Sequence, residues 1–209
     1  AMTDQTLPAI EVRALEKRFG GVAAVKGISF TLARGEVLGL LGGNGAGKTT
    51  TIGMIMGLVL PTAGSVRVFG VDMAKDRYAV LHRMNFESPY VDMPHRLTVR
   101  QNLDVFARLY GVTAIDERIS TLAHDLHLDA FLDRAAGQLS AGQKTRVALA
   151  KSLINDPDLL LLDEPTASLD PDTADWVRTR LETYRRDHKA SILLASHNMA
   201  EVERLCDRV

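Results

Sequence analysis

Apolar positions recur along the chain with two different periods, which separate strands from helices. In its first third the pattern predicts strands over residues 10–19, 25–32, 36–41 and 64–70. Side chains alternate along a strand, so the second of these places Ile28, Phe30 and Leu32 on one face. Gly20 and Gly21 separate the first two strands and indicate a turn.

The period then becomes helical and later returns to that of strands. Residues 50–56 and most of 98–154 carry apolar residues on one helical face and predict helices. The runs 159–162 and 191–195 are apolar throughout, as expected for strands buried on both faces of a sheet, and an amphipathic helix separates them. Strands come first, helices fill the middle and strand–helix–strand units follow, so we expect an α/β fold.

The composition narrows the functional classes. The 209 residues are 46% hydrophobic, enough for a sizeable core, and a formal net charge of −1 gives no electrostatic reason to expect nucleic acid as a partner. A single cysteine, Cys206, excludes a disulfide framework and is typical of a reducing compartment. No apolar run approaches the roughly 20 residues that a membrane-spanning helix needs. We therefore expect a soluble, cytoplasmic protein.

A glycine-rich segment between a predicted strand and a predicted helix gives the strongest chemical signal. It matches the phosphate-binding pattern G-x-x-x-x-G-K-[ST] with Gly42, Gly43, Asn44, Gly45, Ala46, Gly47, Lys48, Thr49 and Thr50. Glycines let backbone N–H groups surround phosphate oxygens, Lys48 adds a positive charge, and the Thr49 hydroxyl can bind magnesium. The following helix aims its dipole at the phosphates. The alternative is a glycine-rich turn with a surface lysine, which the flanking elements disfavour.

Two carboxylates, Asp163 and Glu164, follow the run 159–162 at the sheet edge where parallel strands place ligands. Cleavage of a phosphoanhydride bond needs one acid to hold magnesium and a second to polarise the attacking water, roles that suit Asp163 and Glu164 respectively. A strand that simply ends in polar residues is the alternative. Ser140 with Gln143 predicts a capping box at the start of a helix, and such a helix N-terminus is also an anion site.

In this order the motifs resemble those of an ABC-type ATPase, the nucleotide-binding domain of ABC transporters. The resemblance covers nearly the whole chain and rests on residues 42–50, 139–143, 159–164, 168–170 and His197. It implies an α/β fold with a P-loop NTPase core and mostly parallel sheet, an N-terminal antiparallel β subdomain and an inserted α-helical lobe.

The resemblance also implies roles for single residues. Lys48 and the loop amides would bind the β- and γ-phosphates of ATP, and His197 would contact the γ-phosphate. Thr49 and Asp163 would hold Mg²⁺, while Glu164 would be the catalytic base. These residues together would form the phosphate and metal part of the site.

The remaining roles concern adenine and a second subunit. Phe19 would stack on adenine and Val25 would line the same pocket, although an aromatic residue is more often part of a core. Asp170 would lie at a subunit interface. The segment that would close on ATP bound by the opposite subunit consists of Ser140, Ala141, Gly142 and Gln143. The active unit would be a homodimer, or a heterodimer of ABC subunits, around two ATP molecules.

Structural alternatives exist for two of these assignments. Asn198 with Glu201 predicts a capping box for the helix after His197, which needs no role in binding. Asp170 followed by Pro171 predicts a helix N-cap with proline in the first turn. The joint spacing of the motifs favours the functional interpretation.

Two departures from the family pattern leave its chemistry intact. Gly43 stands where proline is usual, which changes the flexibility of the unfolded loop but not its amides. Ala141 replaces a glycine of the signature segment and adds one methyl group.

Glu87 is the third departure, since it occupies the position of a glutamine that contacts magnesium and water in the family. Ser88 is the other candidate for this position. Both lie in the polar stretch 85–96, which contains Pro89 and Pro94 and predicts an irregular segment. We hypothesise that Glu87 either ligates the metal directly or is held back until magnesium arrives.

The resemblance implies an ATP-hydrolysing subunit that drives transport through a separate integral-membrane partner, peripheral on the inner face of the cell membrane. One alternative is an ABC-type ATPase that acts on DNA or ribosomes, which the near-neutral charge does not support. Another is a regulator that binds ATP without hydrolysis, against which Glu164 and His197 argue. The middle lobe favours an exporter-type system, and no nucleic acid is expected.

The predicted organisation is one domain over residues 1–209. Its core would comprise residues 1–86 and 157–209, and its helical lobe about 87–156. The family pattern usually continues beyond a segment like 205–209 into further strands, so we expect a truncated C-terminal end.

Overall fold

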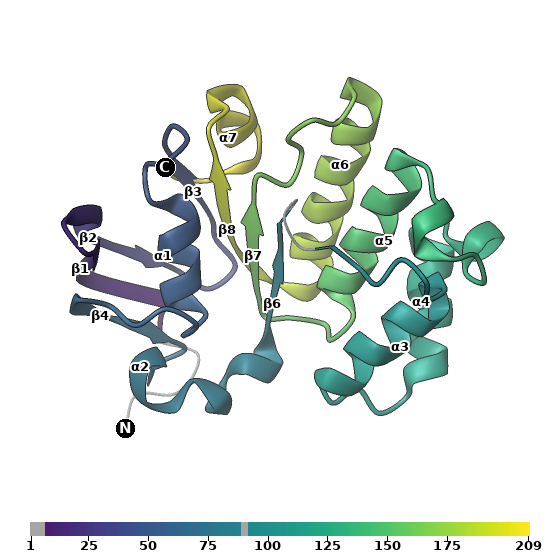
Figure 1. Ribbon diagram of the computed structural model, residues 1–209, viewed down its shortest axis with the longest axis horizontal. Coiled ribbons are helices and arrows are strands. Elements are labelled where there is room, and N and C mark those ends of the chain that lie inside the picture. Colours follow the sequence, from purple (N-terminus) through teal and green to yellow (C-terminus); the bar gives the residue numbers. More distant parts are fainter. Residues whose placement is uncertain (1–6, 89–91) are drawn as a thin grey trace.

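The computed structural model describes residues 7–88 and 92–209, so the predicted turn residue Pro89 lies outside the described residues. Two β-sheets and a group of helices lie side by side (Figure 1). In chain order the elements are β1 (Ile10–Phe19), β2 (Val22–Leu32), β3 (Val37–Leu41), α1 (Lys48–Ile55), β4 (Ala63–Val68), β5 (Val71–Asp72), α2 (Met73–Asp76), β6 (Met84–Glu87), α3 (Val99–Leu109), α4 (Ile115–Asp125), α5 (Ala141–Leu153), β7 (Leu159–Asp163), α6 (Pro171–His188), β8 (Ser191–Ser196) and α7 (Met199–Leu205). Short 3₁₀ turns occur at Arg77–Ala79, Leu81–Arg83, Asp129–Phe131 and Ala136–Gln138.

The antiparallel sheet has the strand order β2-β1-β4-β5. The two predicted N-terminal strands pair with each other across the turn at Gly20 and Gly21, with Val12 opposite Phe30. The second strand begins at Val22 rather than at the predicted residue 25, because pairing with β1 continues to the turn. The predicted strand over 64–70 is β4, which pairs with the other edge of β1.

The parallel sheet has the strand order β3-β8-β7-β6. Its edge strand β6 corrects the prediction of an irregular segment over 85–96, which is wrong for Asn85 through Glu87. Those residues pair in register with Leu160, Leu161 and Leu162 of β7. A polar residue interrupts the strand pattern there, but the buried Asn85 amide donates to the carbonyl oxygen of Lys151 at 3.1 Å. Tertiary hydrogen bonds thus stabilise a strand that hydrophobic periodicity does not predict.

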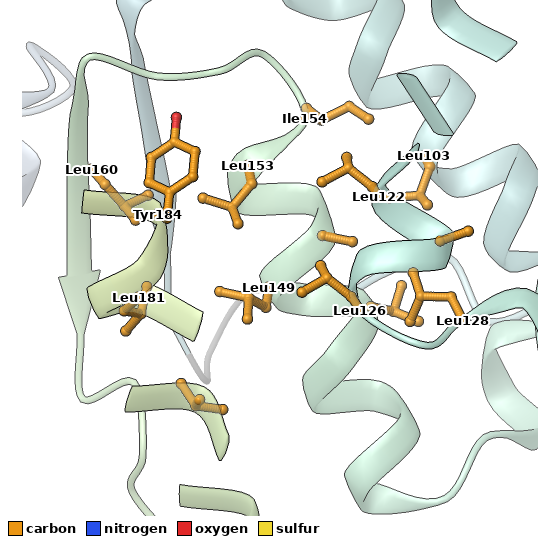
Figure 2. Packing of buried hydrophobic residues seen from close by; sticks show 14 of the residues in the cluster. Leu103, Leu122, Leu126, Leu128, Leu149, Leu153, Ile154, Leu160, Leu181 and Tyr184 are labelled. Atoms are coloured by element: carbon orange, nitrogen blue, oxygen red, sulfur yellow. The ribbon is translucent and has the colours of Figure 1, made fainter. Parts of the chain in front are cut away.

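The central strands divide the hydrophobic core between their two faces. Leu159 and Leu161 of β7 pack toward the antiparallel sheet and α1, whereas Leu160 and Leu162 pack toward the helices. This two-residue alternation explains why the run is apolar throughout. Figure 2 shows the second cluster, which extends from Leu160 across α6 and α5 to the α3–α4 helices.

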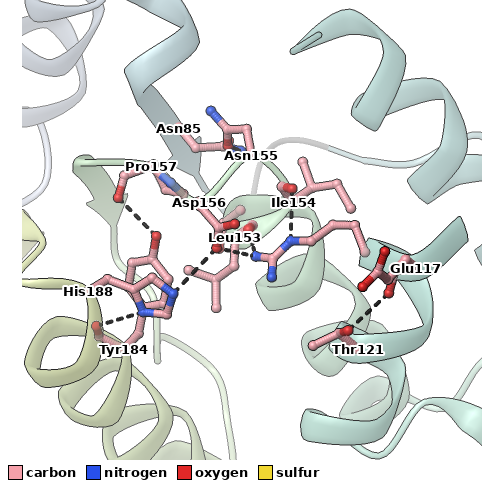
Figure 3. Close-up of polar contacts among 12 residues, drawn as sticks. Asn85, Glu117, Thr121, Leu153, Ile154, Asn155, Asp156, Pro157, Tyr184 and His188 are labelled. Atoms are coloured by element: carbon pink, nitrogen blue, oxygen red, sulfur yellow. Dashed lines mark hydrogen bonds and ion pairs between the residues drawn. The ribbon is translucent and has the colours of Figure 1, made fainter. Parts of the chain in front are cut away.

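Polar contacts join the helical lobe to the loop before β7. Arg118 of α4 donates to the carbonyl oxygens of Leu153 and Ile154, at the C-terminal end of α5. On the other side of this loop the Tyr184 hydroxyl donates to the Pro157 carbonyl oxygen at 2.9 Å (Figure 3). The lobe and α6 are therefore both anchored to the segment that leads into the central strand.

In the part of the chain that the structure describes, no helix is both long and apolar enough to cross a bilayer. The mostly parallel sheet, the antiparallel N-terminal strands and the inserted helices agree with the predicted fold class.

Candidate functional site

The glycine-rich loop connects β3 to α1 and begins the candidate site. Gly47 is the N-cap of α1 and adopts a φ of 89°, in the region that favours glycine. A Cβ atom at this position would lie 2.2 Å from the carbonyl oxygen of Ala24 in β2. Backbone freedom and close packing therefore both require glycine here. They place the N-terminus of α1 against the sheet.

The loop encloses a cavity of about 240 Å³ that is lined by its own residues and by Ala24, Asp163 and Glu164. The Lys48 side chain is 8% exposed. Its ammonium donates to the carbonyl oxygen of Gly43 at 3.0 Å and also to that of Gly42. A buried cation and a helix N-terminus thus meet in one concave site, an arrangement suited to a phosphate chain.

Thr49 and Asp163 come together at this cavity although 114 positions separate them. The Thr49 hydroxyl donates to Asp163 Oδ2 at 2.7 Å. A hydroxyl and a carboxylate oxygen are the hard donors that Mg²⁺ prefers, and phosphates and water usually supply the rest of its shell. Within residues 7–88 and 92–209 no group of three or more His, Cys, Asp or Glu side chains could hold a metal ion. The pair therefore fits a magnesium ion that arrives with a nucleotide.

Glu164 lies directly after β7 with a φ of 52°, which is uncommon for a residue other than glycine. Its N–H donates to the Ala195 carbonyl oxygen of β8 at 2.8 Å, so the sheet edge holds this backbone in place. Glu164 Oε1 lies 2.9 Å from His197 Nδ1 and 3.7 Å from Lys48 Nζ. The carboxylate thus contacts both cations of the site. Uncommon backbone conformations of this kind cluster at active sites.

Other predicted residues lie apart from this centre. Ser140 and Gln143 form the expected capping box at the start of α5, which begins at Ala141. Asp170 caps α6 through the Thr173 N–H at 3.0 Å, with Pro171 in the first turn. Of the described residues, neither Ser140 to Gln143 nor Asp170 lines the cavity of the glycine loop.

The two predicted adenine contacts differ in exposure. Phe19 ends β1, is 53% exposed, and lies 5.0 Å from the Lys17 ammonium. Its ring face is accessible to a ligand. Val25 is 5% exposed and packs beneath the loop, since a Cβ atom on Gly47 would come within 3.1 Å of its Cγ2 atom. Val25 therefore supports the loop from below.

Glu87 faces a different neighbour from the predicted metal site. Its Oε2 atom lies 3.5 Å from Lys151 Nζ of α5, and both side chains are largely buried. Burial raises the pKa of the Glu87 carboxyl to about 7, although Lys151 acts in the opposite direction. Glu87 shares a second cavity of about 240 Å³ with Glu164. Metal ligation by Glu87 remains a prediction.

Residues that the sequence did not single out also bound the site. Ser196, at the end of β8, accepts the N–H of Gly42 at its carbonyl oxygen at 3.3 Å. The predicted capping box of Asn198 and Glu201 is wrong, because the Glu201 carboxylate accepts from Ser196 and Thr166 instead. Only Asn198 caps α7, through the N–H groups of the first turn. The i, i+3 spacing of a capping box is the same whether the acid turns back to the helix or away from it.

Comparisons with known proteins agree with the motifs. The family described as "ABC transporter" matches residues 25–167. A Nod factor export ATP-binding protein I of Burkholderia lata is 41% identical over 202 residues, which cover 96% of this chain and 66% of the relative. The protein of the same name from Rhizobium meliloti is 40% identical over 203 residues, covering 96% of this chain and 60% of the relative. The chain thus spans less than two thirds of the length of these relatives.

Solved structures share the fold. A structure of the ATP-binding subunit of an ABC transporter superimposes with a TM-score of 0.86 at 28% identity, covering 96% of this chain and 85% of that chain. Clostridium perfringens cbiO1, described as part of the ABC transporter complex cbiONQ, gives a TM-score of 0.82 at 28% identity, covering 96% and 82%.

Proposed function

This chain belongs to the ABC transporter family, and we propose that it binds and hydrolyses ATP to drive transport through a separate membrane-spanning partner. The observation that carries the proposal is the position of Glu164. Its carboxylate lies at the edge of the phosphate cavity, between Lys48 and His197. This arrangement combines the cationic cradle of a nucleotide site with a base at the right edge.

Binding of ATP would use the loop amides and Lys48 for the β- and γ-phosphates and the exposed ring of Phe19 for adenine. Thr49 and Asp163 would hold Mg²⁺, which neutralises phosphate charge when bound. The Lys48 ammonium would leave the carbonyl oxygen of Gly43 and donate to phosphate oxygens, where the charge-assisted contact is stronger.

Hydrolysis would depend on Glu164 as the acceptor of a proton from the attacking water. The carboxylate is held at one oxygen by His197 and Lys48, which leaves Oε2 directed away from these cations. Oε2 lies 3.5 Å from the Ser196 hydroxyl, beyond the range of a strong contact. It is therefore the oxygen available to water. His197 would orient the base and contact the γ-phosphate.

We further propose that two subunits close around two ATP molecules. The signature segment, Ser140 to Gln143, lies outside the phosphate cavity of its own chain, which supports a role toward an opposite subunit. Asp170 would lie at the same interface. The dimer would bind its membrane partner at the inner face of the cell membrane. Export is the direction we favour, because the relatives at 38–41% identity are named as export ATP-binding proteins.

The test of hydrolysis is the isosteric variant Glu164→Gln. We expect it to bind ATP as the parent does and to lose turnover by about 100-fold or more, because loss of a general base typically costs 10²–10⁴-fold. Glu182→Gln, at an exposed position of α6, is the matched control and should turn over as the parent does. Turnover of Glu164→Gln near that of the parent would refute the assignment.

The same variant tests the dimer, because ATP that is not hydrolysed should hold the subunits together. Light scattering of Glu164→Gln should report a monomer alone and a dimer with ATP and Mg²⁺. A monomer under both conditions, at concentrations where ATP is bound, would contradict the two-subunit site. Copurification of a multi-span membrane protein from native membranes would identify the partner, and copurified nucleic acid would argue for the alternative class.

A further inference from the structure

We propose that Glu201 is a positioning residue of this site, whose buried carboxylate ties the loop that carries Glu164 to the loop that carries His197. The inference rests on the proposed ATPase function and goes beyond it. Glu201 lies in the first turn of α7 and does not line the phosphate cavity. Its effect would therefore act through the residues that it holds.

The contacts of Glu201 connect two segments that are far apart in sequence. Oε2 accepts the Ser196 hydroxyl at 2.7 Å, and Oε1 accepts the Thr166 hydroxyl. Thr166 is two residues after Glu164, and Ser196 directly precedes His197. Glu201 is 3% exposed, Thr166 9%, and Ser196 is fully buried. One side chain thus bridges both loops inside the protein.

A local capping role does not explain this geometry. In a capping box the acid at the third helical position accepts the N-cap N–H. Here the N–H of Asn198 donates to the Ser196 hydroxyl oxygen at 3.0 Å, and the Glu201 carboxylate lies on the far side of that hydroxyl. Ser196 therefore relays the cap, and Glu201 is free to reach Thr166. The side chain is used for tertiary contact at the expense of a local one.

Ser196 makes the bridge relevant to the reacting groups. Its carbonyl oxygen accepts the N–H of Gly42, the first residue of the phosphate loop, and its hydroxyl lies 3.5 Å from Glu164 Oε2. A hydroxyl has one proton, and the shorter contact to Glu201 commits it. The Ser196 proton is thus withheld from Glu164 Oε2, the oxygen assigned above to water. Glu201 in this way fixes both the position and the polarity of Ser196.

The surroundings offer the carboxylate no replacement partner. Glu201 shares a cavity with Asp175, Arg178 and Arg204, but among the described residues no ion pair joins a cation to Glu201, and Arg204 pairs with Asp175. Buried carboxylates are rare unless they are paired or hydrogen-bonded. The two hydroxyl contacts are therefore what keeps Glu201 in place, and removal of either should loosen the loop on that side.

The experiment compares kcat, the KM for ATP and thermal unfolding of the parent with four variants. Thr166→Val removes one hydroxyl at constant volume and Glu201→Gln removes the carboxylate. Thr166→Ser restores the hydroxyl, and Glu203→Gln is an exposed control on the same helix. We expect Thr166→Val and Glu201→Gln to lower kcat by about tenfold to 100-fold, because small misplacements of reacting groups have this effect. KM should stay within about twofold, and Thr166→Ser and Glu203→Gln should retain parental kcat.

The double variant Thr166→Val/Glu201→Gln should lose little more than either single variant, since both cut the same bridge. Full additivity, parental kcat in both single variants, or kcat losses that merely follow a lower Tm would each overturn the proposal. The last outcome would indicate a structural role only.

Hydrogen exchange without nucleotide separates failure of this inference from failure of the proposed function. In Glu201→Gln, backbone amides of residues 164–168 and 196–198 should exchange faster together, whereas Glu203→Gln should match the parent. If the parent shows no ATPase activity, the proposed function fails while these exchange rates still judge the bridge. Unchanged exchange in both loops would overturn it.

Discussion

At the scale of single residues, Gly47 shows why the glycine pattern identifies a structure as well as a chemistry. Its φ of 89° and the 2.2 Å approach of a hypothetical Cβ to the Ala24 carbonyl oxygen leave no room for another residue. That carbonyl belongs to β2, in the other sheet. The loop is therefore shaped by a neighbour that its own sequence does not contain.

Gly47→Ala should accordingly lose ATP binding by about tenfold or more, because the loop must move away from β2 to admit the methyl group. Gly21→Ala is the control, since a Cβ atom there meets nothing within 4 Å. Fluorescence titration with a nucleotide analogue measures both. Equal affinity in the two variants would show that the loop tolerates the shift.

At the scale of elements, strands with regular apolar patterns could be predicted and β6 could not. Residues 10–19 and 159–162 follow a strand period because their side chains fill the two faces of a core. In β6 the buried residue is Asn85, whose fit depends on Lys151 and Asn155, more than 60 positions away. Such partners are invisible to a local pattern. The edge strand is specified by polar contacts that exist only in the folded chain.

Removal of those contacts tests this explanation of β6. Asn85→Leu keeps the volume but leaves the Lys151 carbonyl, the Asn155 side chain and the Tyr110 hydroxyl without this partner. It should lower the free energy of unfolding by about 3 kcal/mol, because groups left unsatisfied in a core each cost about 1–3 kcal/mol. Tyr110→Phe removes only the 3.2 Å contact and should cost about 1 kcal/mol. Urea unfolding measures both, and equal values would contradict the account.

The candidate site divides in the same way. Thr49 and Asp163 were predicted to share a metal because each lies in a recognisable motif, and the structure brings them within 2.7 Å. Glu201 was assigned to a capping box because the spacing of Asn198 and Glu201 permits one. The direction of its side chain depends on Thr166 in a different loop. Motifs predict which elements meet, whereas side-chain direction follows from the packing around them.

At the scale of the whole molecule, the helical lobe and the sheet are joined through partly charged contacts. Glu87 at the sheet edge pairs with Lys151 of α5, and burial raises the pKa of Glu87 to about 7 from an ordinary value of 4.5. Between these two pH values the folded protein binds a proton that the unfolded chain has released. Stability from this group is therefore greatest below about pH 4.5 and is lost as pH rises through about 7.

Glu87→Gln should remove this dependence, since a glutamine does not titrate. The free energy of unfolding of the variant, relative to the parent, should rise by up to about 3 kcal/mol from pH 5 to pH 8. Urea unfolding at four pH values without nucleotide or magnesium measures this difference. A difference that stays constant with pH would show that Glu87 titrates alike in the folded and unfolded states.

The position of Lys48 has a consequence for the resting protein. The ammonium has partners of its own before any ligand arrives, namely its loop carbonyls and, at 3.7 Å, Glu164. A phosphate chain must compete with them, so ligand affinity measures an exchange of partners rather than the filling of a vacant charge. The same exchange frees Glu164 from one of its two cations. The idle protein thus keeps its lysine and its base neutralised by each other, and entry of the nucleotide would separate them.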